Sequence, residues 1–293
     1  MRRDRVLRLA LAALALPLLA IPATAQGTVT IGSGLQRSTM ASTSCLPNCT
    51  AVLGDLSPDA QASGGVASPV NGTVTTWRLG VGNKAGPTAF RVVRRLPDGT
   101  YTGGGASAVV TPMLNMDNVF PTSLPIQRGD LIGIDCCAAP GVTYFTADHQ
   151  GQRILFEPGF LGDGAAGATP SGTDTFELLL NADIEPTSAF TVTKVRRKKG
   201  NAISATVQVP NPGTLVAGDP NDYALGAPGV QALLLKPGVA DVSPGPVTVT
   251  TRPTQRARDI LARRGRLRVR VKILFTPTHG LPASHTVKVR LKG

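Results

Sequence analysis

The stretch RLRVRVKILF, residues 266–275, alternates between cationic and apolar side chains from Arg266 to Ile273. Successive side chains of a strand point to opposite faces, so this pattern predicts a strand with one buried and one basic face. SHTVKVRLKG, residues 284–293, repeats the alternation, and PTHGLPAS is predicted to turn between them. If the two strands pair antiparallel, seven cations share one sheet surface: Arg266, Arg268, Arg270, Lys272, Lys288, Arg290 and Lys292.

Further short strands are expected around this pair, at 190–195, 202–209, 214–217, 230–235 and 246–251. Seven strands within residues 187–293 are typical of an immunoglobulin-like sandwich. TQRARDILARRG, residues 254–265, predicts a brief helical turn with Ala257, Ile260 and Leu261 on one side and Gly265 as its C-terminal cap. The run RRKKGN, residues 196–201, lies between two of the strands and is interpreted as a hairpin tip.

Residues 26–186 also read as short strands, about nine to eleven of them. GTVTTWRLGVG alternates so that Trp77, Leu79 and Val81 share a face, which predicts that Trp77 belongs to the core. TAFRVVRRL predicts another strand, and NKAG between the two reads as a hairpin-like turn. Other candidates are CTAVLG, SAVVT, TSLPIQ, DLIGID, QRILFE and DTFELLLNADI, and GGG at 103–105 is expected to be a loop. The fold expected is all-β, with a jelly-roll-like sandwich preceding the immunoglobulin-like one.

The first 25 residues combine a basic flank, an apolar stretch from Leu9 to Ile21 and the sequence Ala-Thr-Ala at 23–25. This is the pattern of a secretory signal peptide, with cleavage between Ala25 and Gln26. The apolar stretch is short for a spanning helix and is interrupted by Pro17 and Pro22. We therefore expect a secreted mature chain that is extracellular or associated with the cell envelope, without a membrane span.

Charge divides the mature chain at the same place as the strand patterns. Residues 27–186 carry eight Lys/Arg and thirteen Asp/Glu, a net charge of −5, whereas residues 187–293 carry eighteen Lys/Arg and four Asp, a net charge of +14. Such an asymmetry marks a boundary and a candidate anion-binding half. The basic face could equally be a solvated surface that protects a sheet edge.

Four cysteines in a secreted chain predict disulfides: Cys45, Cys49, Cys136 and Cys137. A vicinal 136–137 bond strains the backbone, so bonds from the first pair to the second are favoured, with a local Cys45–Cys49 bond as the rival. Neither paired CxxC motifs nor neighbouring histidines are present, so no metal site or cofactor is expected.

Sequence signals for catalysis are few, and they favour a non-catalytic protein. Asp148 and His149 are adjacent, a poor geometry for an orienting hydrogen bond on a strand, and His279 and His285 complete the histidines. Asp130 with Asp135, or Glu157 with Asp163, are the carboxylate pairs that a polysaccharide-active enzyme could use. The alternative for the first half is a carbohydrate-binding module, with Tyr101, Tyr144 and Phe145 as its candidate aromatics.

The function expected from these patterns is extracellular or cell-envelope binding through the basic second half, with anionic wall polymers or glycans as partners. Secretion makes nucleic acid an improbable physiological partner, and the basic strands lack the interleaved aromatics of single-strand binders.

Several longer stretches resemble a known group of secreted two-domain β-sandwich proteins of unknown function from high-GC Gram-positive bacteria. They are SPVNGTVTTWRL, FRVVRR, YTGGGAS, LPIQRGDLIGI and FELLLNADIEP in the first half, and FTVTKVRRKKGNAISATVQVPNPGTL and ILARRGRLRVRVKILFTPTHGLPASHTVKVRLK in the second. The resemblance concerns whole-strand patterns and implies architecture more than activity. In similar proteins an Asp-rich, calcium-binding type of repeat can follow NADIEP, whereas TSAFTV follows here, so calcium is not expected.

Overall fold

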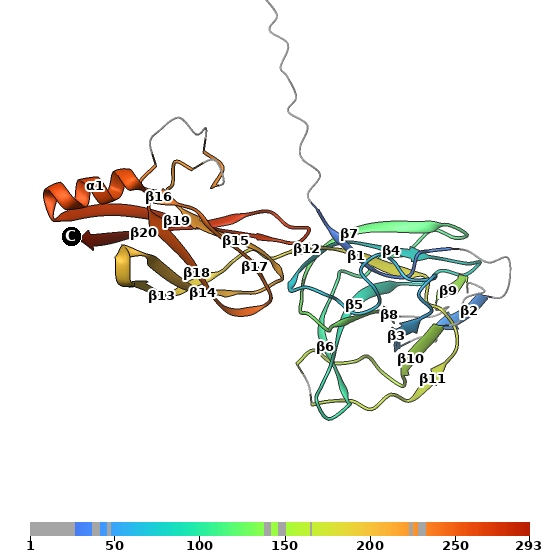
Figure 1. The fold of residues 1–293 in the computed structure, drawn as a ribbon. Coiled ribbons are helices and arrows are strands. Elements are labelled where there is room, and N and C mark those ends of the chain that lie inside the picture. The colour runs from blue at the N-terminus through green and yellow to red at the C-terminus, as the bar shows by residue number, and fades with distance from the viewer. Residues whose placement is uncertain are drawn as a thin grey trace, which may run out of the picture.

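The structure is a computed structural model that describes residues 27–36, 42–45, 48–137, 142–145, 151–164, 166–222, 225–227 and 233–293, with 42–45 and 142–145 described as backbone only. The predicted signal peptide, with Ala25 and Gln26, lies outside the described residues. The predicted all-β class is confirmed: the described chain consists of antiparallel sheets joined by turns, with one α-helix near its end (Figure 1).

Strands β1 to β12 form three sheets in the N-terminal half. A four-stranded sheet has the order β1 (Val29–Gly32), β12 (Leu180–Pro186), β4 (Gly72–Gly80) and β7 (Asp117–Ile126). A six-stranded sheet has the order β11 (Gly172–Asp174), β10 (Gly151–Phe156), β3 (Cys49–Leu56), β8 (Leu131–Cys136), β5 (Thr88–Arg95) and β6 (Tyr101–Ala106). The third sheet pairs β2 (Ser42–Cys45) with β9 (Val142–Phe145).

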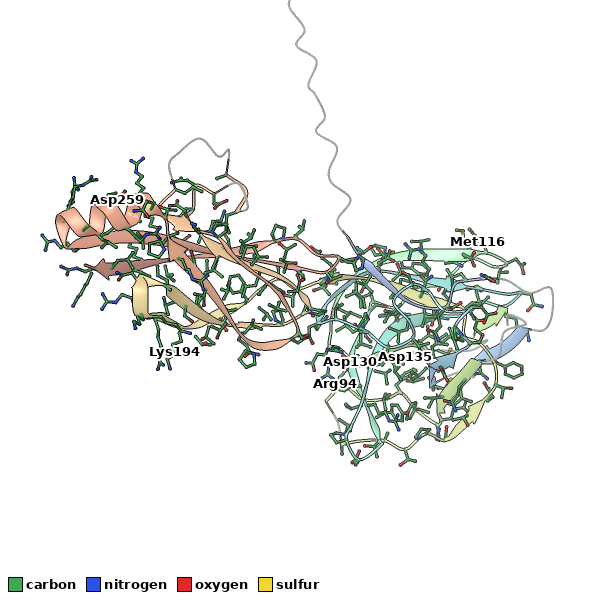
Figure 2. All side chains as sticks on the ribbon, in the orientation of Figure 1. Arg94, Met116, Asp130, Asp135, Lys194 and Asp259 are labelled. Carbon is green, nitrogen blue, oxygen red and sulfur yellow. The ribbon has the colours of Figure 1, made fainter. Side chains whose placement is uncertain are left out.

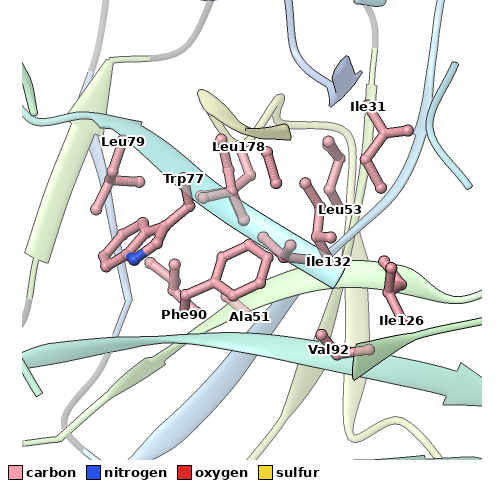
Figure 3. Packing of buried hydrophobic residues seen from close by; sticks show 14 of the residues in the cluster. Ile31, Ala51, Leu53, Trp77, Leu79, Phe90, Val92, Ile126, Ile132 and Leu178 are labelled. Carbon is pink, nitrogen blue, oxygen red and sulfur yellow. The ribbon is translucent and has the colours of Figure 1, made fainter. Parts of the chain in front are cut away.

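A single apolar core lies between the four-stranded and six-stranded sheets, as in a β-sandwich (Figure 3). Trp77 of β4 is fully buried in it, which confirms the prediction that it is a core residue. Its ring lies 5.7 Å from that of Phe90 on the opposite sheet and 4.5 Å from that of Phe120 in β7, both measured between centroids. Burying the large indole between two sheets stabilises this half by a few kcal/mol.

A second apolar cluster covers the other face of the six-stranded sheet. It contains Tyr101, Phe156 and Leu161, and the tyrosine and Phe156 rings meet edge to face with centroids 5.6 Å apart. Because both faces are covered, β8 is buried along its whole length rather than at alternate positions.

The C-terminal half has its own core between two four-stranded sheets. One sheet has the order β13 (Thr191–Arg197), β14 (Ile203–Val209), β18 (Gly245–Pro253) and β16 (Leu235–Lys236). The other has the order β17 (Gly238–Val242), β15 (Gly213–Gly218), β19 (Arg266–Pro277) and β20 (Ala283–Lys292).

Helix α1 (Gln255–Arg264) is longer than the brief turn predicted for this stretch. The Thr254 hydroxyl accepts a hydrogen bond from the Ala257 N–H at 3.3 Å, and Gly265 ends the helix in the left-handed conformation, as its predicted cap role requires. Ala257 and Leu261 are buried and Ile260 is half-buried. Within the described residues, no helix has both the length and the apolar character needed to cross a membrane.

Four local predictions are corrected. GGG at 103–105 lies inside β6, where the β5–β6 register shifts and Gly105 takes a φ of 129°, so the glycines form a bulged strand. NKAG joins β4 and β5, which belong to different sheets, so it crosses the sandwich instead of closing a hairpin. SAVVT is not a strand and contributes only an isolated bridge between Val110 and Thr88. The C-terminal half has eight strands rather than seven because β17 was missed; of the predicted strand 230–235, residues 230–232 lie outside the described residues.

Candidate anion-binding surface

Strands β19 and β20 form the predicted antiparallel pair, and their alternation sorts the side chains as expected. On β19, Val269, Val271 and Ile273 are buried in the core, whereas Arg266, Arg268 and Arg270 between them are exposed. On β20, Leu291 is fully buried, and the cations on either side of it are exposed.

The register places cations directly opposite cations. Arg266 lies opposite Lys292, Arg268 opposite Arg290, and Arg270 opposite Lys288. Neighbouring strands are about 4.8 Å apart, so side chains of like charge rise next to each other at three consecutive outward-facing positions. Such pairs destabilise a sheet by roughly 0.2–1 kcal/mol each. None of these six side chains has an ion pair within the described part of the chain.

Two adjoining open hollows lie over this pair of strands. The first, of about 660 Å³, is lined by Arg264, Arg266, Leu267, Arg268 and Arg290. The second, of about 510 Å³, is lined by Arg268, Val269, Arg270, Lys288, Val289 and Arg290. Because they share Arg268 and Arg290, they form one depression, here named the basic trough and defined by Arg264, Arg266, Arg268, Arg270, Lys288 and Arg290. Figure 2 shows nitrogen-tipped side chains gathered at this end of the molecule, around α1 and the end of β20.

A third hollow, of about 460 Å³, joins the trough to α1 and to the loop after β15. Arg256 and Ile260 of α1 line it together with Arg268 and Arg270, and Asp219 brings in an acidic group. The Asp219 carboxylate is buried and accepts the backbone N–H groups of Asn221 at 3.1 Å and Leu234 at 2.8 Å. Asp219 therefore shapes the loop and does not neutralise the trough by an ion pair.

Lys272 does not join the other predicted cations. Its Nζ donates a hydrogen bond to the Leu225 carbonyl at 2.8 Å, its side chain is half-buried, and its cross-strand partner is Thr286. The loop after β15 lies over this part of β19, so the ammonium group holds the loop rather than facing solvent freely.

The four cysteines come from three strands and the residue after β8. Cys49 and Cys136 are register partners on β3 and β8, and both are fully buried in the same core. Cys137 is a free thiol whose Sγ lies 3.6 Å from the Asp135 carbonyl, and burial raises its pKa, with a further rise from the Asp135 carboxylate. Because Cys137 is free, the predicted bond to this residue is not present in the structure. The side chain of Cys45 in β2 lies outside the described residues, so a bond to Cys136 stays a prediction.

Three of the four carboxylates considered for catalysis are engaged by arginines, whereas Glu157 is half-buried just after β10. Asp130 is bound by Arg94 through two hydrogen bonds of 2.8 and 2.9 Å, and Asp135 by Arg91 through two of 2.6 and 2.8 Å. Arg91 also pairs with Asp163. These contacts tie strands and a loop together, and the Asp130 carboxylate is buried rather than offered at the surface.

The remaining candidate aromatic and titratable residues lie in the N-terminal core, near the start and end of the C-terminal strands, or outside the described residues. Tyr101 is buried in the core, so it does not serve as an exposed sugar-stacking platform. The His285 ring lies 6.1 Å from that of Phe190, and His279 takes a φ of 59° in the turn beside Gly27. Asp148 and His149, and the side chains of Tyr144 and Phe145, lie outside the described residues.

Sequence reasoning missed Arg264 and Arg256, which add cations to the edges of the trough. Arg264 precedes the Gly265 cap, which turns the chain directly from α1 into β19, and this connection was the signal that could have placed it beside Arg266. No protein-family model matches this chain, and no curated protein matches it in sequence.

Proposed function

We propose that the protein is a secreted, non-catalytic binding protein that attaches to anionic polymers outside the cell or on its envelope through the basic trough. The observation that carries this proposal is the set of opposed cation pairs on β19 and β20, none of which forms an ion pair with an acidic side chain of the described residues. An anionic chain in the trough would relieve their mutual repulsion, so binding and local stability are coupled.

Edge protection does not account for the arginines of β19. β20 is the edge strand of its sheet, and exposed cations on it discourage pairing with another chain. If β19 carried acidic residues opposite the cations of β20, the edge strand would stay charged and the repulsion between the two strands would disappear. Instead, Arg268 of β19 lies opposite Arg290 and adds to the repulsion, which favours a binding role for the surface.

Arginine suits this role because its planar guanidinium binds phosphate and carboxylate groups through two parallel hydrogen bonds. The trough is open along its length, which suits a polymer better than a small ligand that needs enclosure. Attraction by exposed charges weakens as salt screens them, so attachment should be salt-reversible.

We also propose the jelly-roll-like and immunoglobulin-like topologies for residues 26–186 and 187–293, following a signal peptide of residues 1–25. Two features support this division. Each half has its own buried apolar cluster, and no sheet contains strands from both halves of the described chain, since β13 belongs to a sheet formed only by C-terminal strands. The wall-polymer or glycan partner and the extracellular or envelope location follow from the signal sequence together with the basic trough.

Retention on isolated bacterial cell walls tests the proposal. The mature chain should bind at low salt and be released as salt rises, and the double variant R268Q/R290Q should bind several-fold more weakly. The matched control is K236Q/R252Q, which removes another exposed, directly opposed cation pair from β16 and β18. Equal losses in both variants would reduce the effect to net charge, and retention that is unchanged at high salt would refute charge-driven attachment.

A further inference from the structure

The tip of the β13–β14 hairpin is fixed to the end of β20 by one asparagine. Asn201 Nδ2 donates to the Lys292 carbonyl at 2.8 Å, and the Lys292 N–H donates to Asn201 Oδ1 at 3.4 Å. Gly200 and Asn201 both take left-handed conformations, with φ of 71° and 58°, which lets the tip turn tightly enough to reach β20. The contact joins the two sheets of the C-terminal half at the end that points away from the N-terminal half (Figure 1).

This contact places a second set of cations next to the basic trough. A hollow of about 520 Å³ is lined by Arg197, Lys198, Lys199, Gly200, Asn201, Lys292 and Gly293. Arg197, Lys198 and Lys199 are exposed and are here named the basic tip. Lys292 belongs to this hollow and is also the register partner of Arg266, a member of the trough, so the two sets adjoin at Lys292.

We infer that the trough and the basic tip form one continuous track for a linear phosphodiester polymer with an alditol backbone; this inference rests on the proposed function and specifies its ligand. Outward-facing residues along a strand recur every ~6.7 Å, so the three cation pairs offer anion contacts at that spacing over about 13 Å. Phosphates joined through a short alditol unit in an extended chain recur at a similar distance, whereas a single phosphate would meet only one pair.

The side chains around the track favour a polymer without bases. Beyond the cations, the outward-facing positions of β20 carry Ser284 and Thr286, and the lining of both hollows of the trough contains no aromatic residue. Binding of single-stranded nucleic acid draws much of its affinity from bases stacked on aromatic side chains. Contacts to the backbone phosphates are what this surface can supply.

Synthetic oligo(glycerol phosphate) of increasing length, titrated into the mature chain at several salt concentrations, tests the track. Affinity and its dependence on salt should rise with length until the chain covers both trough and tip. The variant K198Q/K199Q should bind short oligomers like the wild type but lose affinity for long ones, with the slope of log K against log salt reduced by about 1.4. The control K194Q/R196Q removes two exposed cations of β13 that do not line the hollow and should leave the length dependence intact.

Asn201→Gly distinguishes the position of the basic tip from its charge. Glycine keeps the left-handed backbone and all cations but removes the side-chain contact to Lys292. The variant should weaken binding of long oligomers only. Equal effects on short and long oligomers, or the same loss in K194Q/R196Q, would overturn the continuous track while leaving trough binding intact. Absence of binding to every oligomer, with salt-reversible retention on cell walls preserved, would overturn the phosphodiester ligand alone. Loss of both would refute the proposed function itself. Tighter binding of oligothymidylate with the same number of phosphates would overturn the alditol assignment in favour of nucleic acid.

Discussion

Asn71 and Asn211 exchange hydrogen bonds across the junction between the two halves of the molecule. The Asn71 N–H donates to Asn211 Oδ1 at 2.7 Å, and Asn211 Nδ2 donates back to the Asn71 carbonyl at 2.8 Å. Asn211 Nδ2 also reaches the Thr187 carbonyl at 2.8 Å, and Asn71 Nδ2 reaches that of Pro210 at 2.8 Å. Because Asn211 is fully buried, these bonds make the junction a specific contact between the halves.

Replacing Asn211 with alanine should loosen this junction. The substitution leaves buried backbone groups without partners, at a cost of roughly 1–3 kcal/mol in the free energy of unfolding. Chemical unfolding would measure the loss, and small-angle scattering should show a broader range of orientations between the halves. Asn221→Ala, at an exposed asparagine, is the control. Wild-type scattering and stability in N211A would show that other contacts hold the junction.

Stability and binding should respond in opposite directions to Arg268→Glu. The new carboxylate lies opposite Arg290, so a repulsive cross-strand pair becomes an attractive one and the unfolding free energy rises by roughly 0.2–1 kcal/mol at low salt. Binding to anionic polymer should nevertheless fall, by more than in Arg268→Gln. Thermal unfolding at low and high salt, together with cell-wall retention, checks both signs. A variant that is both less stable and equally retained would contradict the role given to the cation pairs.

The extent to which the fold could be predicted depended on how each strand is buried. β19 and β20 each have one solvent-exposed and one buried face, so their period-two pattern predicted both their pairing and their exposed cations. β6 carries three glycines, which have no side chain to alternate, and the strand was missed for that reason. β17 (GVADV) is short and exposes Val239, so its pattern resembles that of a loop.

The candidate surface was predictable where it lies within a strand and not where it depends on contacts between elements. Six cations of β19 and β20 could be assigned to one surface from alternation alone. Lys272 continues the same alternation, but a loop distant in sequence covers it. Asn201 has no local pattern that indicates its bond to Lys292, because 91 residues separate the two positions.

Stability should fall at acid pH through Asp183. Burial alone would raise the pKa of this carboxyl, but hydrogen bonds from Arg78 and Thr30, each 2.7 Å long, outweigh burial and lower it. Because the pKa is lower in the folded state, the interaction stabilises the fold above the ordinary aspartate pKa of about 3.9 and is lost as the pH falls below it.

Asp183→Asn should therefore cost about 1 kcal/mol at pH 7 and progressively less toward low pH. Unfolding free energies measured across the pH range, with Asp259→Asn on the exposed face of α1 as the control, give the difference curve. A deficit that is constant with pH would mean that the charge on Asp183 does not contribute.

The thiol of Cys137 should react slowly with alkylating reagents. Burial, reinforced by the Asp135 carboxylate, raises its pKa, so little thiolate is present near neutral pH. Its alkylation rate should rise only at a higher pH than that of a free cysteine.

Non-reducing peptide mapping of the mature protein should at the same time recover a disulfide between the Cys45/Cys49 and Cys136/Cys137 segments. Rapid alkylation of four thiols would refute both expectations.

Gly103 permits a loop to close over the six-stranded sheet. Its N–H donates to the Gly162 carbonyl at 2.9 Å, and Arg91 holds the same loop through Asp163. A Cβ at this position would lie 2.8 Å from Arg91 Nη1 and 3.0 Å from the Leu161 carbonyl, and would collide with the Asp163 carboxylate.

Gly103→Ala should therefore displace the loop of residues 159–164 and lower the unfolding free energy by roughly 1–3 kcal/mol, because the crowding involves backbone as well as side-chain atoms. Hydrogen exchange should become faster at Leu161, whose N–H is bonded to the Thr50 hydroxyl at 3.0 Å in the wild type. Gly172→Ala is the matched control, since an added Cβ there meets no atom within 4 Å. If the two variants are equally stable and Leu161 stays protected, the close approach at Gly103 is not what holds the loop. The ion pair between Arg91 and Asp163 and the hydrogen bond from Leu161 to Thr50 would then be enough to position it.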